Sequence, residues 1–484
     1  MIPSAERPSV RGGEIEWLYY ARSKSSTEPP GPKPGSGAPI RTASPQDHRA
    51  LWHNSAAQLL GTIAARLSRA GGILISARLL PVDDFGRITA ALAGYEMLRV
   101  LGEAGLDTRL VRYVAGEPAR AAVEVRRTIV LKLAIYAALF LIALVITRVA
   151  LGPADLSVFG SLAIGIFGMA VTFSVQAAAT GRLDAKGMLP QQAIAGLVFF
   201  ALVTMAAAGP GTAWATALAI GVADLAGGAI FLTYLRRVPE AFAGIGEFGA
   251  AILPALRSWR GALRESLPIG GTTIVGTAYL RIGIGVLSLA WGTAAVAQYG
   301  ISYRVVEVFL MASAAIGGSA YAVTARVEAS GGAGAGLDLL ATILRRTALP
   351  IFAGGVLVAI GAQLLPLIFG TDYIASVGTT RVLAFALPPM FLNGLLTAHL
   401  YGRGRYTTVL RIALINLGLN VLLLAALVPS GGPPGAALAV VATECGNTYL
   451  QSRAAGLGRG TWATRVVALS LILGALTFAM SYGR

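Results

Sequence analysis

Long apolar runs dominate the chain from about residue 55 onward. A helix needs about 20 mostly apolar residues to cross the hydrocarbon core of a bilayer. The first two runs are the most polar, because they carry several arginines. The pattern predicts an all-α membrane protein with about 13 (12–14) transmembrane helices. The expected spans are 55–79, 84–105, 128–150, 156–180, 188–208, 212–235, 266–290, 294–322, 346–370, 382–402, 412–428, 434–453 and 466–483.

Composition agrees with this pattern. Hydrophobic residues make up 55% of the chain and charged residues only 13%, whereas a soluble domain carries about 25% charged residues. The single cysteine, Cys445, excludes an internal disulfide, and no metal site is expected. The apolar runs are too long and too continuous for the strands of a membrane barrel.

The distribution of basic residues predicts the topology. If the N-terminus is cytoplasmic, most of the 39 Lys and Arg residues fall in the N-terminal tail and the inner connections. The outer connections and outer tail then hold only Arg381 and Arg484. This asymmetry follows the positive-inside rule. It also explains the net charge of +16 by loops that face an anionic leaflet, so no nucleic-acid partner is expected.

Two stretches that are rich in polar residues divide the chain. Eight of the 23 prolines lie in the first 50 residues, which are therefore expected to be disordered. The second stretch is a long basic connection between the sixth and seventh spans. The expected divisions are a tail at 1–50, a six-helix bundle at 51–235, a cytoplasmic linker at 236–265, a second six-helix bundle at 266–453 and an extra C-terminal helix at 454–484.

An internal repeat underlies the two bundles. Residues 217–228 read ALAIGVADLAGG and residues 437–448 read ALAVVATECGNT, with an acid at the eighth position of each. Three further features recur in the same order, and the offsets within the four pairs lie between 214 and 221 residues. Because each unit has six spans, both halves enter the membrane from the same side, which predicts a parallel repeat around a central cavity. The pairs are Arg66 with Arg281, Gly86 with Gly300, Arg182 with Arg403, and Asp224 with Glu444.

Charged residues within the spans are the candidate functional groups. Each charge at the bilayer centre would cost about 2.5–3.5 kcal/mol on insertion scales, so these residues should face a wet cavity or each other. Arg78, Arg87, Lys132 and Arg148 lie near span ends and are expected to reach the headgroups. The deeper set is Arg66, Arg69, Glu96, Arg99, Glu103, Asp224, Arg281, Arg304, Glu307 and Glu444.

Spacing predicts partners for some of these charges. Glu96 with Arg99, and Arg304 with Glu307, are three residues apart and share a helix face. Arg66 and Arg69 have the same spacing but the same sign, so they need an anion from elsewhere, either a cavity acid or a substrate.

Two roles stay open for the acids of the repeat: they neutralise cavity arginines, or they couple transport to ions. The expected substrate-binding residues are Arg66, Arg69, Arg99, Arg281 and Arg304, and the coupling or cavity acids are Glu96, Asp224, Glu307 and Glu444. No catalytic residue is expected.

Several stretches together resemble a known family, over roughly residues 50–470. They are similar to the oligosaccharide flippases of polysaccharide biosynthesis, the Wzx-like (O-antigen flippase) branch of the multidrug/oligosaccharidyl-lipid/polysaccharide (MOP) exporter superfamily, which also includes the MATE transporters. The stretches are NSAAQLLGTIAARLSRAGGILISARLLPVDDFGRITA, LGEAGLDTRLVRYVA, QYGISYRVVEVFLMA, LPLIFGTDYIASVGTTRVLAFALPPMFLN and LVPSGGPPGAALAVVATE.

The resemblance implies movement of an undecaprenyl-diphosphate-linked oligosaccharide across the bacterial inner membrane by alternating access. It implies no cofactor, a proton or sodium gradient as the driving force, and a polysaccharide polymerase and glycosyltransferases as partners. Family members often carry an acid two residues after the arginine of the seventh span, but here Gly283 follows Arg281 at that spacing. Aromatic rings for sugars would be Tyr279, Tyr303 and Tyr321, for which packing is the alternative, and bends are expected at Pro268, Pro350, Pro388 and Pro389.

Three alternatives stay open. A peptidoglycan-precursor flippase would also carry a lipid diphosphate. A cation-coupled multidrug exporter would need a net acidic cavity, whereas the spans here carry more basic residues than acids. A membrane polymerase or ligase would need groups gathered on the outer face, but the longest outer connection, about 370–381, has Asp372 as its only acid.

Overall fold

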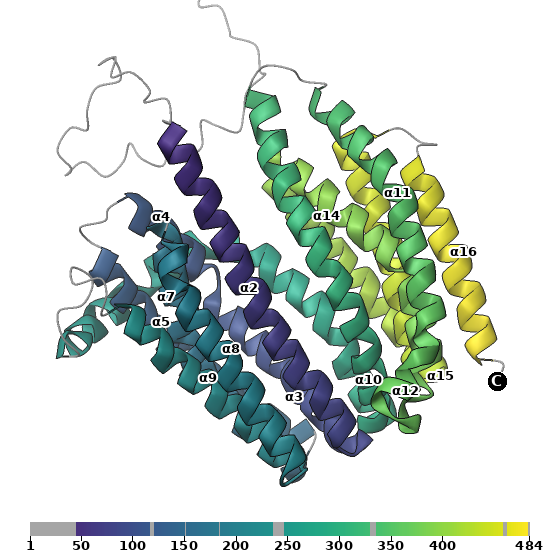
Figure 1. Cartoon of the computed structure of the whole chain (residues 1–484), viewed down its shortest axis with the longest axis horizontal. Helices are drawn as coiled ribbons and strands as arrows, with labels where there is room; N and C mark the ends of the chain where they lie inside the picture. The colour runs from purple at the N-terminus through teal and green to yellow at the C-terminus, as the bar shows by residue number, and fades with distance from the viewer. Residues whose placement is uncertain are drawn as a thin grey trace, which may run out of the picture. The chain divides into compact units, whose positions relative to one another are not determined.

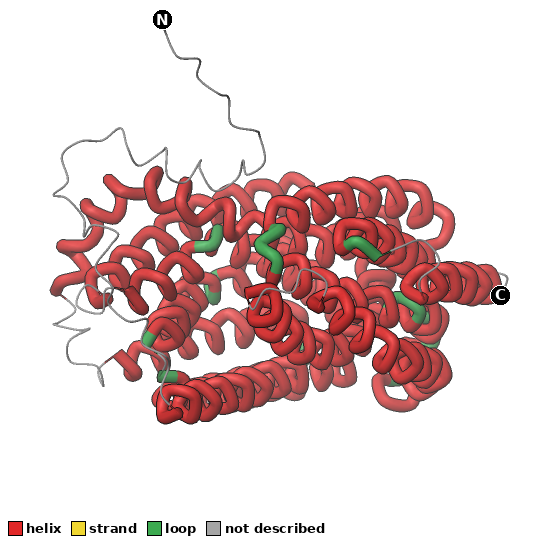
Figure 2. Tube along the Cα trace, turned by 90° about the horizontal axis from the view of Figure 1, so that it is seen from above, coloured by secondary structure: helices red, strands yellow, loops and turns green. Residues whose placement is uncertain are grey.

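Helix accounts for nearly all of the backbone that the computed structural model describes, which comprises residues 45–116, 121–150, 152–182, 184–235, 246–329, 335–457 and 462–482. These described residues contain no strand, and short loops join the helices (Figure 2). The all-α prediction is confirmed. Residues 1–50 and 51–484 form separate units, and the following description concerns the second. Residues 1–44 of the predicted tail lie outside the described part of the chain.

The first half of this unit is a series of helices with short connections. Ala104 has a left-handed conformation with φ of 43°, and it ends one helix before the chain turns at Gly105. Asp184 caps another helix, because its carboxylate accepts a hydrogen bond from the backbone N–H of Gly187 at 3.1 Å. The helices are α2 (Pro45–Leu79), α3 (Val82–Glu103), α4 (Leu106–Gly116), α5 (Ala121–Ala150), α6 (Pro153–Ala163), α7 (Ile166–Gly181), α8 (Ala185–Ala208) and α9 (Ala213–Leu235).

Two long helices of the second half bend at glycines. Gly292 in α10 has φ of 76° and Gly432 in α15 has φ of 51°. Residues with a Cβ atom avoid this region of positive φ. Each glycine therefore lets the chain turn from one predicted span into the next. The elements are α10 (Gly246–Ala329), α11 (Ala335–Gly361), η3 (Ala362–Leu364), α12 (Leu365–Phe369), η4 (Thr371–Tyr373), α13 (Ser376–Ala384), α14 (Leu387–Gly402), α15 (Tyr406–Ala455) and α16 (Trp462–Tyr482).

Membrane-spanning character is confirmed by length and composition. Eight helical segments of the described chain are long and apolar enough to cross a bilayer, and the pair α13 and α14, bent by 43°, adds a ninth if it is one span. Two of the eight, Gly270–Glu307 and Tyr406–Ala455, contain the glycine bends. Tyr406–Ala455 covers two predicted spans, and Gly270–Glu307 covers most of one and the first half of the next. The protein is a multi-pass membrane protein. The number of 13 crossings and the division into two six-helix bundles stay predictions.

Two large apolar cores hold the helices of residues 51–484 together. One core joins α2, α3 and α5–α9 around the fully buried Tyr95 and Leu162, and it extends to α10, α12 and η4. The other joins α10, α13 and α15 around Tyr299 and Val441. Figure 1 shows α4, α5, α7, α8 and α9 gathered on one side and α11, α12, α14, α15 and α16 on the other. Each large side chain that is buried in such a core contributes about 1.5–3 kcal/mol. Because Ala297 and Ile301 of α10 belong to the first core and Ala93 of α3 belongs to the second, the cores also hold the two groups of helices against each other.

Helices α3 and α10 approach each other most closely at two glycines. A Cβ atom on Gly86 would overlap the carbonyl oxygen of Thr293, and one on Gly300 would lie 2.7 Å from Cγ2 of Thr89. The Thr293 hydroxyl also donates a hydrogen bond to the Asp83 carboxylate at 2.6 Å. The two glycines that the repeat pairs in the sequence therefore lie in one contact between the halves.

Candidate functional site

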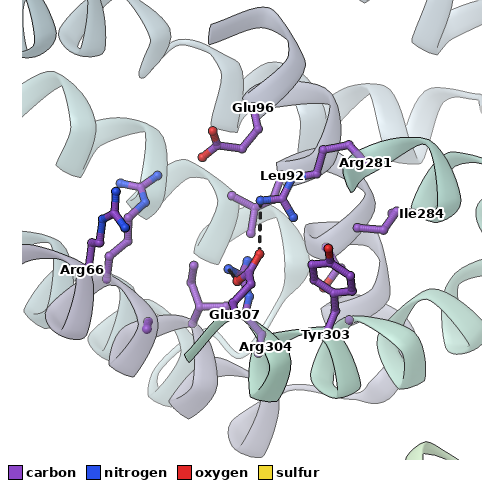
Figure 3. A pocket seen from close by; sticks show the side chains of 13 residues that line it. Arg66, Leu92, Glu96, Arg281, Ile284, Tyr303, Arg304 and Glu307 are labelled. Carbon is purple, nitrogen blue, oxygen red and sulfur yellow. Dashed lines mark hydrogen bonds and ion pairs between the residues drawn. The ribbon is translucent and has the colours of Figure 1, made fainter. Parts of the chain in front are cut away.

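A charged cavity lies between α2, α3 and α10 (Figure 3). Its volume is about 140 Å³, which is room for on the order of ten water molecules. Six of the nine predicted site residues line it. These are Arg66, Arg69, Glu96, Arg281, Arg304 and Glu307.

Helical spacing and one bend bring these side chains together. Arg66, Arg69 and Ile73 follow one face of α2, and Glu96 lies on α3. The bend of α10 at Gly292 folds the segment of Arg281 back beside the segment of Glu307. As a result, Nη2 of Arg281 lies 3.4 Å from Oε1 of Glu307.

Glu307 serves two arginines. Arg304 donates from Nη1 to Oε2 of Glu307 at 2.6 Å, so the pair that the spacing predicts is present. The other oxygen of the same carboxylate faces Arg281. One negative charge thus offsets two positive ones, and this wall of the cavity keeps a net positive charge.

Arg99 is committed to neighbouring acids rather than to the cavity. Its Nε donates to Glu96 at 2.8 Å and its Nη1 to Glu103 at 3.2 Å, while its guanidinium lies 5.0 Å above the ring of Phe173. Arg99 is not among the residues that line the cavity. The ion pair with Glu96 is as predicted, but Arg99 becomes the weakest candidate for substrate binding.

Asp224 neutralises Arg69 from behind the cavity wall. Arg69 donates from Nη1 to Oδ1 at 2.6 Å and from Nη2 to Oδ2 at 3.0 Å, which is the bidentate geometry of a strong ion pair. The Tyr95 hydroxyl donates to Oδ2 at 2.7 Å. Of the two predicted roles of Asp224, neutralisation of a cavity arginine is the one that this geometry matches.

Arg66 and Arg281, the pair matched by the repeat, both keep unused hydrogen-bond donors. Among the described side chains, Arg66 has no acidic partner within salt-bridge distance. The buried Nε of Arg281 has no hydrogen-bond partner in the described part of the chain. Figure 3 shows Arg66 on one side of the cavity and Arg281 on the other. Four arginines and two glutamates line the cavity, so its charge favours an anionic ligand.

Glu444 lies apart from this cavity. It is buried in α15 at 5% exposure, and Asn393 of α14 donates to its carboxylate at 2.6 Å and to its backbone carbonyl at 3.1 Å. It is not among the lining residues. Of the two roles that stay open for Glu444, neutralisation of a cavity arginine does not match this geometry, because no arginine lies within salt-bridge distance of it in the described residues.

The position of Lys132 contradicts the expectation that its side chain reaches the lipid headgroups. It does not extend to the headgroups but is fully buried, and its Nζ donates to both carboxylate oxygens of Asp107 at 2.9 Å. A buried ammonium group must find a counter-charge, and Asp107 at the start of α4 provides it. Sequence reasoning missed this pair, because the spacing of 25 residues does not show which faces of the two helices meet.

The other expected residues fall in different places. Tyr303 lines the cavity, and Tyr279 lies beside Glu444. Pro388 and Pro389 lie in the first turn of α14, directly after the bend that separates it from α13. The side chain of Tyr321 lies outside the described residues. No group of three or more His, Cys, Asp or Glu that would hold a metal ion occurs in the described part of the chain.

Solved structures share this fold at low sequence identity. The inward closed lipid II flippase MurJ is 12% identical, with a TM-score of 0.63 over 87% of this chain and 97% of that chain. An inward-facing MATE family multidrug resistance transporter of the MOP superfamily is 12% identical, with a TM-score of 0.60 over 87% and 96%. A MOP superfamily transporter from Pyrococcus furiosus with a binding pocket of reversed polarity is 15% identical, with a TM-score of 0.55 over 90% and 96%.

Sequence comparison identifies the family. No curated protein matches the chain significantly. Residues 51–325, more than half of the chain, match the polysaccharide biosynthesis proteins. The solved structures that share this fold are those of transporters and a flippase. The chain belongs to the polysaccharide biosynthesis protein family and has the fold of the MOP superfamily.

Proposed function

We propose that the protein is a flippase, which moves an undecaprenyl-diphosphate-linked oligosaccharide from the inner to the outer leaflet of the bacterial inner membrane. It would serve the synthesis of surface or exported polysaccharide, with the N-terminus in the cytoplasm. The observation that carries this proposal is the net positive cavity, in which Arg66 and Arg281 retain unused donors.

A lipid diphosphate matches this cavity chemically. A guanidinium presents parallel N–H donors that fit two oxygens of one phosphate, and arginines on both walls match the two phosphates of the group. The wet volume next to these donors suits hydrated sugars. The ring of Tyr303, which lines the same cavity, offers an apolar face for a sugar.

Alternating access requires that a closed contact between the halves opens. Under the predicted topology, Gly86 and Thr293 lie at the outer end of α3 and α10, where the two helices touch. The cargo would enter with this contact closed and leave when it parts. A proton or sodium gradient would drive the cycle without a cofactor. Glycosyltransferases would act before the translocation and a polymerase after it.

Two other cargoes remain as alternatives. A peptidoglycan precursor is also a lipid diphosphate, and the fold shared with the lipid II flippase MurJ supports it as an alternative cargo. An exporter of cationic drugs is less compatible with four arginines against two glutamates in the cavity wall.

The test compares Arg66→Ala and Arg281→Ala with wild type in a strain that lacks the chain. We expect each variant to reduce polymer export by about tenfold or more, because a charge-assisted hydrogen bond contributes about 1.5–3 kcal/mol. Arg66→Lys should retain part of the export, because the charge remains and the parallel donors do not. Lipid-linked oligosaccharide should accumulate in the membrane of the alanine variants.

Arg148→Ala is the matched control, because Arg148 is exposed at the end of α5, and it should export like wild type. Membrane abundance is measured for each variant, and Arg66→Ala should be as abundant as wild type, since it breaks no ion pair with the described side chains. Normal export by both cavity variants at normal abundance would refute the diphosphate site. Rescue of a strain depleted of its peptidoglycan-precursor flippase would reassign the cargo.

A further inference from the structure

Glu444 has an environment that an ionised carboxylate does not tolerate well. It is buried at 5% exposure in α15, within the second core of the molecule. In the described part of the chain, no Lys, Arg or His lies within salt-bridge distance of it. An isolated ionised carboxylate that is buried in this way is disfavoured by several kcal/mol.

The groups that face Glu444 from the neighbouring helices are neutral. Asn393 of α14 donates to Oε2 at 2.6 Å, and Asn447 lies three residues further along α15. Tyr279 of α10 lies next to the carboxyl, but its hydroxyl is buried and has no hydrogen bond of normal geometry in the described structure. The adjacent thiol, that of Cys445, points to the backbone carbonyl of Val467 in α16.

The repeat explains why a counter-charge is missing here. Arg66 corresponds to Arg281, so the offset of 215 residues makes Arg69 correspond to Ile284. Both of these residues line the cavity. The second half therefore carries an isoleucine where the first half carries the arginine that neutralises its acid. A carboxyl without that partner is stable when it holds a proton instead.

Two tyrosines lie near Glu444, and one of them lines the cavity. Tyr279 lies close to both Glu444 and Tyr303, and Tyr303 lines the cavity wall. The hydroxyls of both tyrosines are buried and lack partners among the described residues. A path for a proton between the carboxyl and cavity water would need these hydroxyls to hydrogen-bond to each other and to that water.

We propose that Glu444 is the proton-binding site that couples the cycle of this transporter to the proton gradient. The carboxyl takes up one proton from cavity water when the cavity faces outward, and it releases the same proton through Tyr279 and Tyr303 when the cavity faces inward. No bond other than O–H forms or breaks. A sodium ion fits less well, because it needs several oxygen ligands, whereas Asn393 presents its NH₂ group to the carboxylate.

The first experiment measures stability and needs no cargo. The apparent Tm of the purified full chain in detergent is followed from about pH 5 to pH 9 for wild type and Glu444→Gln, which keeps the shape of the protonated acid. At low pH both hold a neutral group, so their Tm values should agree. At high pH the wild type must bury an unpaired charge, so its Tm should fall below that of Glu444→Gln.

Asp372→Asn is the matched control, because it removes one carboxylate from an exposed position. Its Tm should keep the same pH dependence as wild type. A constant difference in Tm between wild type and Glu444→Gln across the pH range would overturn the proposal.

The second experiment rests on the proposed function. Proteoliposomes with a lipid-diphosphate oligosaccharide are compared with and without a proton gradient of one pH unit, which shifts the cargo distribution by up to about tenfold if one proton moves per cargo. Wild type should respond to this gradient and Glu444→Gln should not. A wild type that responds to a sodium gradient alone, or a Glu444→Gln variant that still responds to protons, would overturn the proposal. A wild type that moves no such cargo overturns the proposed function, while the Tm experiment still decides the role of Glu444.

Discussion

Asp224 and Glu444 occupy equivalent places in the two halves of the chain, yet their surroundings differ. Asp224 forms a bidentate ion pair with Arg69 and accepts a hydrogen bond from Tyr95. Glu444 is equally buried, and among the described residues its carboxylate faces neutral donors, of which Asn393 lies at 2.6 Å, and no base. The two halves of the repeat thus keep an acid at the same position, but the hydrogen-bond and ion-pair partners of the two acids differ.

The difference shows where each half can specialise. The close approach of α3 and α10 uses one glycine from each half, Gly86 and Gly300, so here the two halves act alike. The partner of the acid, by contrast, is present as Arg69 in one half and replaced by Ile284 in the other. A duplicated unit can keep its packing and give one copy a structural ion pair and the other a site for ion coupling.

The largest expected effect concerns the parallel orientation on which this comparison depends. In a background of Cys445→Ser, single cysteines are placed at the exposed residues Thr108, Ala154, Asp372 and Thr407. In intact cells an impermeant thiol reagent should label positions 154 and 372 and leave 108 and 407 unlabelled. Permeabilised cells, in which all four positions should react, are the control. Labelling of 407 but not 108 from outside would mean an inverted repeat, and the two acids would then not be equivalent.

The next effect comes from making the first half resemble the second. Arg69→Ile leaves Asp224 buried with Tyr95 alone, so we expect a loss of about 3 kcal/mol in stability at neutral pH. Part of this loss should be regained as the pH falls, because the unpaired carboxyl can then take a proton. Tm against pH, compared with wild type and with Arg69→Ile/Asp224→Asn, measures this. A loss that is independent of pH would show that Arg69 stabilises the fold through packing rather than through its charge.

Much of this arrangement could be predicted from the sequence, and the exceptions have a physical cause. Apolar runs and the distribution of Lys and Arg predict a multi-pass helical protein, and spacing predicts the pairs Glu96–Arg99 and Arg304–Glu307. Those features are local or additive along the chain. Which distant residues meet depends on helix rotation and packing, so Lys132 with Asp107 and Arg69 with Asp224 required the structure. The sequence also could not predict that Glu444 has no basic partner among the described residues, because a sequence shows an acid but not the distance to its nearest base.

A smaller effect distinguishes the two glycines that the halves share. Gly86→Ala would push a Cβ atom against the backbone carbonyl of Thr293, which cannot rotate away, so we expect a loss of about 2 kcal/mol. Gly300→Ala meets Cγ2 of Thr89, and a loss of about 1 kcal/mol is expected. Thr89→Ser removes that methyl group, so Thr89→Ser/Gly300→Ala should regain most of the loss, whereas Thr293→Ser should not rescue Gly86→Ala. Equal rescue at both sites, measured by Tm, would contradict the asymmetry.

The smallest effect is expected from one conservative substitution made beside each acid. Tyr95→Phe removes a hydroxyl that donates to the Asp224 carboxylate at 2.7 Å, so we expect a loss of about 1.5 kcal/mol. Tyr279→Phe removes a hydroxyl that has no hydrogen bond of normal geometry to any described residue, so the stability of this variant should change by less than about 0.5 kcal/mol. Its effect should appear instead as slower proton uptake in the gradient experiment, because the path between Glu444 and the cavity loses one hydroxyl. Equal losses of Tm for the two variants would mean that Tyr279 donates a stabilising hydrogen bond to Glu444, as Tyr95 does to Asp224. The surroundings of the two acids would then be equivalent.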